Sequence, residues 1–353
     1  MEIREATQND NEALLGLQKK CPMGVDFVVA VDSSPDYFAR SRPLQNWHVF
    51  VAIENQQIIG SIACTIDTRQ IQGKPTKTAF LYGMIVDPTK RRTGVATQLQ
   101  QHIEKYLSKQ KVSLCHLLVM EENIPSIRLC QKNGFQHIKD SPRFSLMVYK
   151  PMKPQNEANI KPMMPEDIKD VVAMMNETYL DHDFYMPYTE ETFKAYIQKL
   201  PQNNQENILL LKQGENIQAC LGYWDFNKII RDRVLKLNTR LSAIAFPIRF
   251  LGLFTKMPKI PKPGETLKQW YLFPVAYKDV TALTELIKHV NNLALKNNIT
   301  TLVTAQDDQS PLVNILSKFR NVQIKTHYFV KPLRKTQVLP KKERKFYIDI
   351  TSI

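Results

Sequence analysis

The sequence is short of cysteine and of long apolar runs, and both shortages exclude classes of protein. Its 353 residues include five cysteines, an odd number at scattered positions: Cys21, Cys64, Cys115, Cys130 and Cys220. This usage suits reduced thiols better than the disulfide framework of a small secreted domain. The longest mainly apolar run, 241–254, contains Arg249 and falls short of the roughly 20 residues that a membrane-spanning helix needs. Since Met1–Glu5 does not resemble a signal peptide either, we expect a cytoplasmic protein.

Acidic residues are scarce beside basic ones, and this imbalance bears on partners. The chain has 34 Asp and Glu against 48 Lys and Arg, with a formal net charge of +14. Such a charge favours nucleic acid, an anionic membrane or the phosphates of CoA without choosing among them. RNA-recognition, zinc-finger and basic-zipper patterns are absent, so we expect no specific nucleic acid. His, Cys and Asp show no metal-ligand spacing and no Ser-His-Asp pattern stands out, so we expect no metal.

The length and the order of the predicted elements indicate two domains. A chain of 353 residues with 43% hydrophobic content is long for one compact domain and sufficient for two packed cores. A polar, proline-bearing stretch at 151–158 is typical of a linker. The pattern of residues 3–10, a short strand and then an Asp that starts a helix, recurs at 160–167. We therefore expect a duplicated α/β fold with domains 1–150 and 159–353, each a twisted mixed sheet flanked by helices.

The stretch 79–109 changes its hydrophobic period in the middle. Apolar residues run through 79–86 as in a buried strand, and from Val95 onward they recur at helical spacing. Between these segments lies a short basic loop, Lys90-Arg91-Arg92-Thr93-Gly94. The first amides of a helix have no partners within the helix, the helix dipole favours an anion there, and glycine lets a phosphate approach the backbone. The loop therefore predicts an anion site.

Two motifs in this region resemble hallmarks of one family. The spacing Val86-x-Pro88-x-x-Arg91-x-x-Gly94-x-Ala96 resembles motif A of the GNAT superfamily of acyl-CoA-dependent N-acyltransferases. Downstream, Asn123-x-x-Ser126-x-x-x-Cys130-x-x-x-Gly134-Phe135 resembles the second hallmark. The motifs cover about 80–138, and the order of elements extends the resemblance over about 1–150. A looser resemblance to bacterial tandem GNAT proteins covers most of the chain. The second half has Tyr277-Lys278-Asp279 in place of the glycine-bearing loop, so we expect a degenerate GNAT-like domain there.

The resemblance implies that acetyl-CoA lies between the strands 79–86 and 114–119. Its pantetheine arm would pair with backbone on the first strand, and its pyrophosphate would lie on the amides that start the following helix. The residues implied in cofactor binding are Met84, Ile85, Val86, Arg91, Arg92, Thr93, Gly94, Val95, Ala96, Thr97, Asn123 and Ser126.

The reaction that the resemblance implies is direct attack of an amine on the thioester, which needs a base, donors for the oxyanion and often an acid. The family's usual glutamate base falls on Leu118, and its usual tyrosine acid falls on Cys130, which a buried core thiol would also explain. The remaining catalytic candidates are Glu121, Glu122 and Tyr82, whereas His116 is expected to be a satisfied core residue. We predict acetyl transfer from acetyl-CoA to an amine of a small molecule or a protein. A catalytically silent acyl-CoA-binding or regulatory protein is the alternative.

A basic insert of about 227–262 interrupts the second half. From Ile230 to Leu251, apolar residues alternate at steps of four and three, with basic residues between them. This spacing predicts a basic amphipathic helix that is kinked or ended near Pro247. Its narrow apolar stripe favours packing within the chain or in a homodimer over contact with a membrane. A third interpretation is an interaction module that uses this insert.

Overall fold

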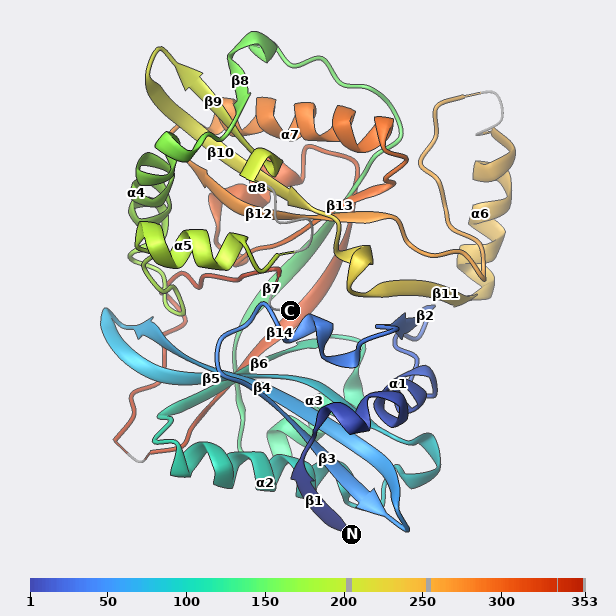
Figure 1. Cartoon of the computed structure of the whole chain (residues 1–353). Helices are drawn as coiled ribbons and strands as arrows, with labels where there is room; N and C mark the ends of the chain where they lie inside the picture. The colour runs from blue at the N-terminus through green and yellow to red at the C-terminus, as the bar shows by residue number, and fades with distance from the viewer. Residues whose placement is uncertain (201–204, 252–254, 335, 352–353) are drawn as a thin grey trace.

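The computed structural model of the protein describes residues 1–200, 205–251, 255–334 and 336–351 (Figure 1). Across these residues, one mixed sheet of 12 strands runs through the molecule, and a two-stranded ribbon lies beside it. Helices cover both faces of the large sheet (Figure 1). None of the helices in these ranges is long and apolar enough to cross a membrane.

The N-terminal half supplies three helices and seven strands, and most of its strands precede the helix α2. In chain order the elements are β1 (Glu2–Glu5), α1 (Asn11–Lys19), β2 (Phe27–Asp32), β3 (Trp47–Glu54), β4 (Gln57–Ile71), β5 (Lys74–Val86), α2 (Val95–Lys109), β6 (Leu114–Met120), α3 (Ile124–Lys132) and β7 (Gln136–Met147).

The C-terminal half repeats this order with an insertion before β12. Its elements are β8 (Ile160–Pro162), α4 (Ile168–Tyr179), α5 (Glu190–Ile197), β9 (Ile208–Gln213), β10 (Asn216–Trp224), β11 (Arg231–Leu237), α6 (Thr239–Leu251), β12 (Gln269–Tyr277), α7 (Val280–Lys296), β13 (Thr301–Ala305), α8 (Pro311–Leu316) and β14 (Asn321–Pro332). The α/β class and the two similar halves confirm the fold expected from the sequence.

Each half contributes one strand to the other. The sheet order is β1-β3-β4-β5-β6-β14-β7-β13-β12-β10-β9-β8. β14 from the C-terminal half pairs with β6, and β7 from the N-terminal half pairs with β13. Figure 1 shows β7 and β14 passing together through the centre of the molecule, where they pair antiparallel. Hydrogen bonds therefore join the halves on both sides of 151–158, and the division into domains there stays a prediction.

The helix α2 packs closely against the sheet of the N-terminal half. Val95, Leu99, Ile103 and Leu107 recur every fourth residue and are buried in the core between α2 and the sheet. A Cβ at Gly60 would lie 3.0 Å from a methyl carbon of Leu99 and 3.1 Å from one of Val95. Glycine at this position thus lets the start of α2 lie directly on β4 and fixes where the helix begins.

The prediction of one amphipathic helix across the basic insert is wrong. Residues 231–237 form the strand β11, which pairs antiparallel with β2 to make the two-stranded ribbon. Among the described residues from 231 to 262, the helix is confined to α6. Its start is tied to the ribbon by the Asn238 amide, which donates to the Asp26 carbonyl at 2.8 Å. This segment forms a strand instead of a helix because β2 has a free edge with which it can pair. A register shift between Val234 and Lys236 accommodates the apolar spacing from which a helix was predicted.

The apolar surface of α6 remains partly open within the chain. Leu241 and Ile244 are exposed, whereas Ala245 is buried. The predicted insert extends through residues 252–254, which lie outside the described residues. Packing in a homodimer and contact with a membrane both stay predictions.

Candidate functional site

The start of α2 has the geometry predicted for an anion site. Gly94 precedes the helix with φ +92°, in the left-handed region, and has no side chain with which to cap it. Lys90 is paired with Glu54, whereas Arg91 and Arg92 are exposed and form no ion pair with any residue that the structure describes. The first amides of α2 lack partners within the helix. Positive charge and free amide groups therefore meet at this turn.

The strands β5 and β6 diverge beside this turn. They pair in parallel only from Thr78 to Phe80 on β5 and from Leu114 to His116 on β6. Beyond these residues β5 pairs with β4 alone and β6 pairs with β14. We call the space between the diverging strands the β5–β6 gap.

Backbone groups of β5 face the β5–β6 gap at two of the three residues predicted to bind pantetheine. The Asp87 amide donates to the Ile59 carbonyl of β4 at 2.8 Å. Because backbone groups alternate in direction along a strand, those of Ile85 face β4 while those of Val86 and Met84 face the gap. The Val86 carbonyl at present accepts the Cys21 thiol at 3.3 Å.

The loop after β6 places the second group of predicted cofactor residues. Asn123 caps α3, its side-chain oxygen accepting the Ser126 amide at 3.2 Å. Glu121 is exposed and pairs with Lys325 at 3.1 Å, and Glu122 is exposed. The described structure thus gives Asn123 a local structural role and leaves both glutamates at the surface.

Of the other two catalytic candidates, Cys130 is buried and Tyr82 is partly buried. Cys130 lies in the core of the N-terminal half with 5% of its surface exposed, and burial raises the pKa of its thiol to about 12. Burial also raises the pKa of Tyr82, whose hydroxyl donates to the Ser41 hydroxyl at 2.8 Å. Both groups are therefore protonated at neutral pH, and the Cys130 thiol is a weak acid that lies inside the apolar core.

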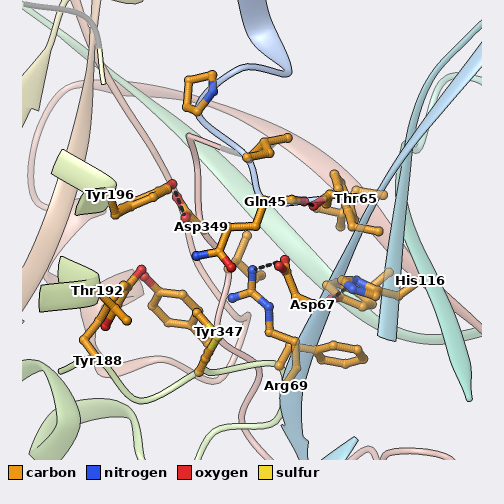
Figure 2. A pocket seen from close by; sticks show the side chains of 18 residues that line it. Gln45, Thr65, Asp67, Arg69, His116, Tyr188, Thr192, Tyr196, Tyr347 and Asp349 are labelled. Carbon is orange, nitrogen blue, oxygen red and sulfur yellow. Dashed lines mark hydrogen bonds and ion pairs between the residues drawn. The ribbon is translucent and has the colours of Figure 1, made fainter. Parts of the chain in front are cut away.

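A pocket lies between the two halves (Figure 2). The side chains of β4, β5 and β6 that line it alternate with those packed against α2, so the pocket lies on the opposite face of the sheet. Residues of β4, β5 and β6 line one side, and residues of α5 and of the segment after β14 line the other. The polar and aromatic lining residues include Gln45, Thr65, Asp67, Arg69, Phe80, His116, Phe184, Tyr188, Thr192, Tyr196, Tyr328, Tyr347 and Asp349. Leu118, at the position of the family's usual base, also lines it. Phe80 and His116 are the last paired residues of these two strands, and Leu118 lies just beyond them, so the pocket lies at the closed end of the β5–β6 gap.

Carboxylates outnumber guanidinium groups among the side chains that line this pocket. Asp67 pairs with Arg69 at 2.9 Å, and the Tyr196 hydroxyl donates to Asp349 at 2.7 Å, as Figure 2 shows. Asp349 also accepts the Thr351 amide at 2.9 Å. With one arginine against two aspartates, the pocket carries a negative balance that suits a cation.

His116 packs among aromatic rings at the base of the pocket. Its Nδ1 lies 2.7 Å from the Tyr328 hydroxyl, and its ring lies 4.5 Å from that of Phe184 and 5.2 Å from that of Phe80. Burial lowers the pKa of His116 well below its ordinary value, so the imidazole is neutral at neutral pH. The structure places this residue as a hydrogen-bonded side chain of the pocket wall.

Sequence reasoning missed the contribution of the C-terminal segment to the pocket. Tyr347 and Asp349 reach it because three contacts hold the segment across the sheet. The Lys139 ammonium donates to the Arg344 carbonyl at 2.7 Å, the Phe346 amide donates to Asp307 at 2.6 Å, and Arg344 pairs with Asp183 at 2.8 Å. The aromatic residues of 184–196 and 346–347 were the one signal present in the sequence, and without a motif they could not be placed.

Comparison with known proteins agrees with the geometry. Residues 14–135 match the model of the Acetyltransferase (GNAT) family, which confirms the resemblance found in the sequence. None of the curated proteins with which the sequence was compared matches it. Among solved structures, N-myristoyltransferase of Saccharomyces cerevisiae with bound myristoyl-CoA aligns over 93% of this chain and 78% of its own, with a TM-score of 0.61 and 13% identity.

Two bacterial structures are also similar. A GCN5-related N-acetyltransferase from Sphaerobacter thermophilus aligns over 96% of this chain and 98% of its own, with a TM-score of 0.59 and 13% identity. A probable N-acyltransferase from Enterococcus faecalis V583 aligns over 94% and 72%, with a TM-score of 0.53 and 10% identity. At these identities the likeness shows the fold, and it extends over both halves of the chain.

Proposed function

We propose that this chain, which carries a GNAT acyltransferase domain at residues 14–135, transfers an acetyl group from acetyl-CoA to an amine. The observation that carries the proposal is the order of three features along β5. The uncapped start of α2 follows β5, the strands β5 and β6 diverge beyond Phe80 and His116, and these two residues line the pocket between the halves. The pyrophosphate would bind the amides after Gly94 and the pantetheine would follow Met84 and Val86.

The packing at the base of the pocket supports a short acyl group. The rings of Phe80, His116 and Phe184 contact one another in a row, and Tyr328 stacks beside His116 at 5.7 Å. These rings occupy the sheet face on which a long chain would otherwise extend. The bound myristoyl-CoA of the yeast relative makes chain length the first property to test.

The charge of the pocket supports an amine acceptor. An amine arrives at neutral pH mainly as the ammonium ion, which carboxylates and aromatic faces attract. It must lose a proton before it attacks the thioester. We assign this proton to Asp349, because its carboxylate lines the pocket and hydrogen bonds from the Tyr196 hydroxyl and the Thr351 amide fix its position there.

The experiment measures thioester consumption with a panel of small amines and amino-terminal peptides, and with acetyl-, octanoyl- and myristoyl-CoA. We expect turnover with acetyl-CoA and at least one amine. Asp349→Asn should lower kcat by about 100-fold or more with little change in CoA affinity. Thr192→Ala, another change in the pocket wall, is the matched control and should have a much smaller effect.

Leu118 and the buried Cys130 favour a second candidate, an acyl-CoA-binding protein without catalysis. It predicts binding of acetyl-CoA at the start of α2 and no consumption of thioester with any acceptor. We place either protein in the cytoplasm, since all five cysteines are buried free thiols.

A further inference from the structure

The two exchanged strands bring a group of metal-ligating side chains together outside the pocket. His137 and Asp140 lie on β7, and His327 lies on β14. The His137 Nε2 is 2.9 Å and the His327 Nδ1 is 2.7 Å from the same carboxylate oxygen of Asp140. The three ligand atoms all lie within 4.8 Å of one another. We propose that His137, Asp140 and His327 bind a divalent transition-metal ion, Zn²⁺ in the first instance, between the strands of the two halves.

A strand irregularity creates this grouping. Residues three apart on a regular strand point to opposite faces, so His137 and Asp140 would be separated by the sheet. Here the pairing of β7 with β14 shifts between Tyr328 and Phe329, and Ile138 is the extra residue on β7. The shift turns His137 to the face of Asp140, and His327 is the direct partner of Asp140 across the ladder.

The donor set matches the chemistry of the proposed ion. Two imidazole nitrogens and one carboxylate oxygen are a common set for Zn²⁺, with a fourth position left for water. His137 is the exposed member and gives solvent access to the ion, while Asp140 and His327 are partly buried. Zinc–ligand distances of about 2.0–2.2 Å put tetrahedral ligand atoms roughly 3.3 Å apart, so the group needs to open by about half an ångström.

The neighbouring charges are compatible with this binding. Burial alone would raise the pKa of Asp140, but hydrogen bonds from His327, Lys325 and His137 outweigh it and lower the pKa, so the carboxylate is ionised. Lys325 lies 3.1 Å from the second oxygen of Asp140 and 3.1 Å from Glu121. The first oxygen therefore remains for the metal, and Glu121 balances part of the lysine charge.

Binding requires a change at the histidines. His137 Nε2 also lies 3.1 Å from the Lys139 carbonyl, a contact that the metal would replace. Each imidazole must present its unprotonated nitrogen to the metal, with its proton on the other nitrogen. The ion would then join β7 of one half to β14 of the other.

The test is equilibrium dialysis of the full chain against ZnCl₂ at pH 7.5, together with thermal unfolding. The wild type should bind one Zn²⁺ per chain and unfold at a higher Tm when zinc is present. His137→Ala and His327→Ala should each weaken binding by at least about 100-fold and remove the rise in Tm. His48→Ala is the matched control and should bind as the wild type does, because His48 contacts a single carboxylate, Glu5, at 2.6 Å.

A spectroscopic measurement separates this site from adventitious binding. Co²⁺ should give the visible absorption of a low-coordinate ion in the wild type and in His48→Ala, and none in Asp140→Asn. Circular dichroism without metal checks that each variant folds, which the exposed position of His137 favours. Failure of the wild type to bind Zn²⁺ at stoichiometric concentration, or equal binding by His137→Ala and His327→Ala, would overturn the proposal.

Discussion

The helices α2 and α7 occupy the same place in the two halves, but their first turns differ in what they offer. α2 begins after Gly94, which leaves the turn open beside Arg91 and Arg92, and neither arginine forms an ion pair within the described part of the chain. α7 begins after Asp279, whose carboxylate accepts the amides of Thr281 at 2.9 Å and Ala282 at 3.1 Å. The second helix start is therefore occupied by its own anion, and a phosphate would meet a negative charge there.

The strands that lead to these helices, β5 and β12, also differ in how accessible their backbone is to a ligand. In β5 the residues opposite the register shift are Gly83 and Met84, and in β12 they are Phe273 and Pro274. Proline has no amide hydrogen to offer a ligand. The Tyr179 hydroxyl also donates to the Val275 carbonyl at 2.6 Å, at a position that corresponds to the pantetheine strand. Two halves with the same fold are thus compatible with a single acyl-CoA site, because a few residues decide whether the backbone of β5 or β12 is accessible to the ligand.

The largest effect should come from Gly94→Glu. Glutamate places a carboxylate and a strained left-handed backbone at the proposed phosphate position, and juxtaposed like charges cost several kcal/mol. Calorimetry with acetyl-CoA should show one site in the wild type and no detectable binding in the variant. Gly264→Glu is the matched control, since Gly264 has φ +94° with open space around it, and it should keep the site. Two equivalent sites per chain would break the comparison between the halves.

Asp10→Asn should lower the free energy of unfolding by about 1–2 kcal/mol at pH 7. The hydrogen bond from Arg4 at 2.8 Å is the main cause that lowers the pKa of Asp10 to about 2. Because this pKa lies below the ordinary value, the stabilisation is present above about pH 4 and is lost as the pH falls toward 2. Urea unfolding at pH 7 and pH 3 measures the difference between the two proteins. An unchanged difference at pH 3 would contradict the assignment.

Asp279→Ala should cost about 1 kcal/mol of stability through loss of the α7 cap. It should leave the affinity and stoichiometry of acetyl-CoA unchanged, because Phe273-Pro274 and the Tyr179 contact with Val275 still occupy the backbone of β12. Thermal unfolding and calorimetry on the same preparation give both values. Appearance of a second CoA site would show that the Asp279 cap alone prevents CoA binding in the C-terminal half.

Cys130→Ala should have the smallest effect on turnover, a change within about tenfold, or 1.4 kcal/mol in the barrier. The thiol is buried in the core and its pKa is about 12, so it is a poor proton donor for the leaving thiolate. Steady-state kinetics measures the change, with an amine that the acceptor panel identifies. A loss near a thousandfold at constant CoA affinity would make Cys130 the acid after all.

The sequence by itself determined the fold class and the start of α2. Hydrophobic period, the single glycine of a basic loop and the spacing of two motifs act over a few residues, so they can be read locally. The same local pattern misled at 231–237, because a strand needs a partner and β2 lies about 200 residues away in the chain. Hydrophobic periodicity indicates which side chains are buried. It does not indicate which strand has a free edge close enough for pairing.

Only the tertiary structure decided the pocket and the exchanged strands. Asp67 and Asp349 line one pocket from opposite sides because β14 crosses into the other half and carries the C-terminal segment with it. His137, Asp140 and His327 meet for the same reason, and the sequence, which indicated no metal spacing, held no sign of it. Contacts between distant residues depend on strand order and register, which are set by the burial of the whole sheet and by no short stretch of the chain.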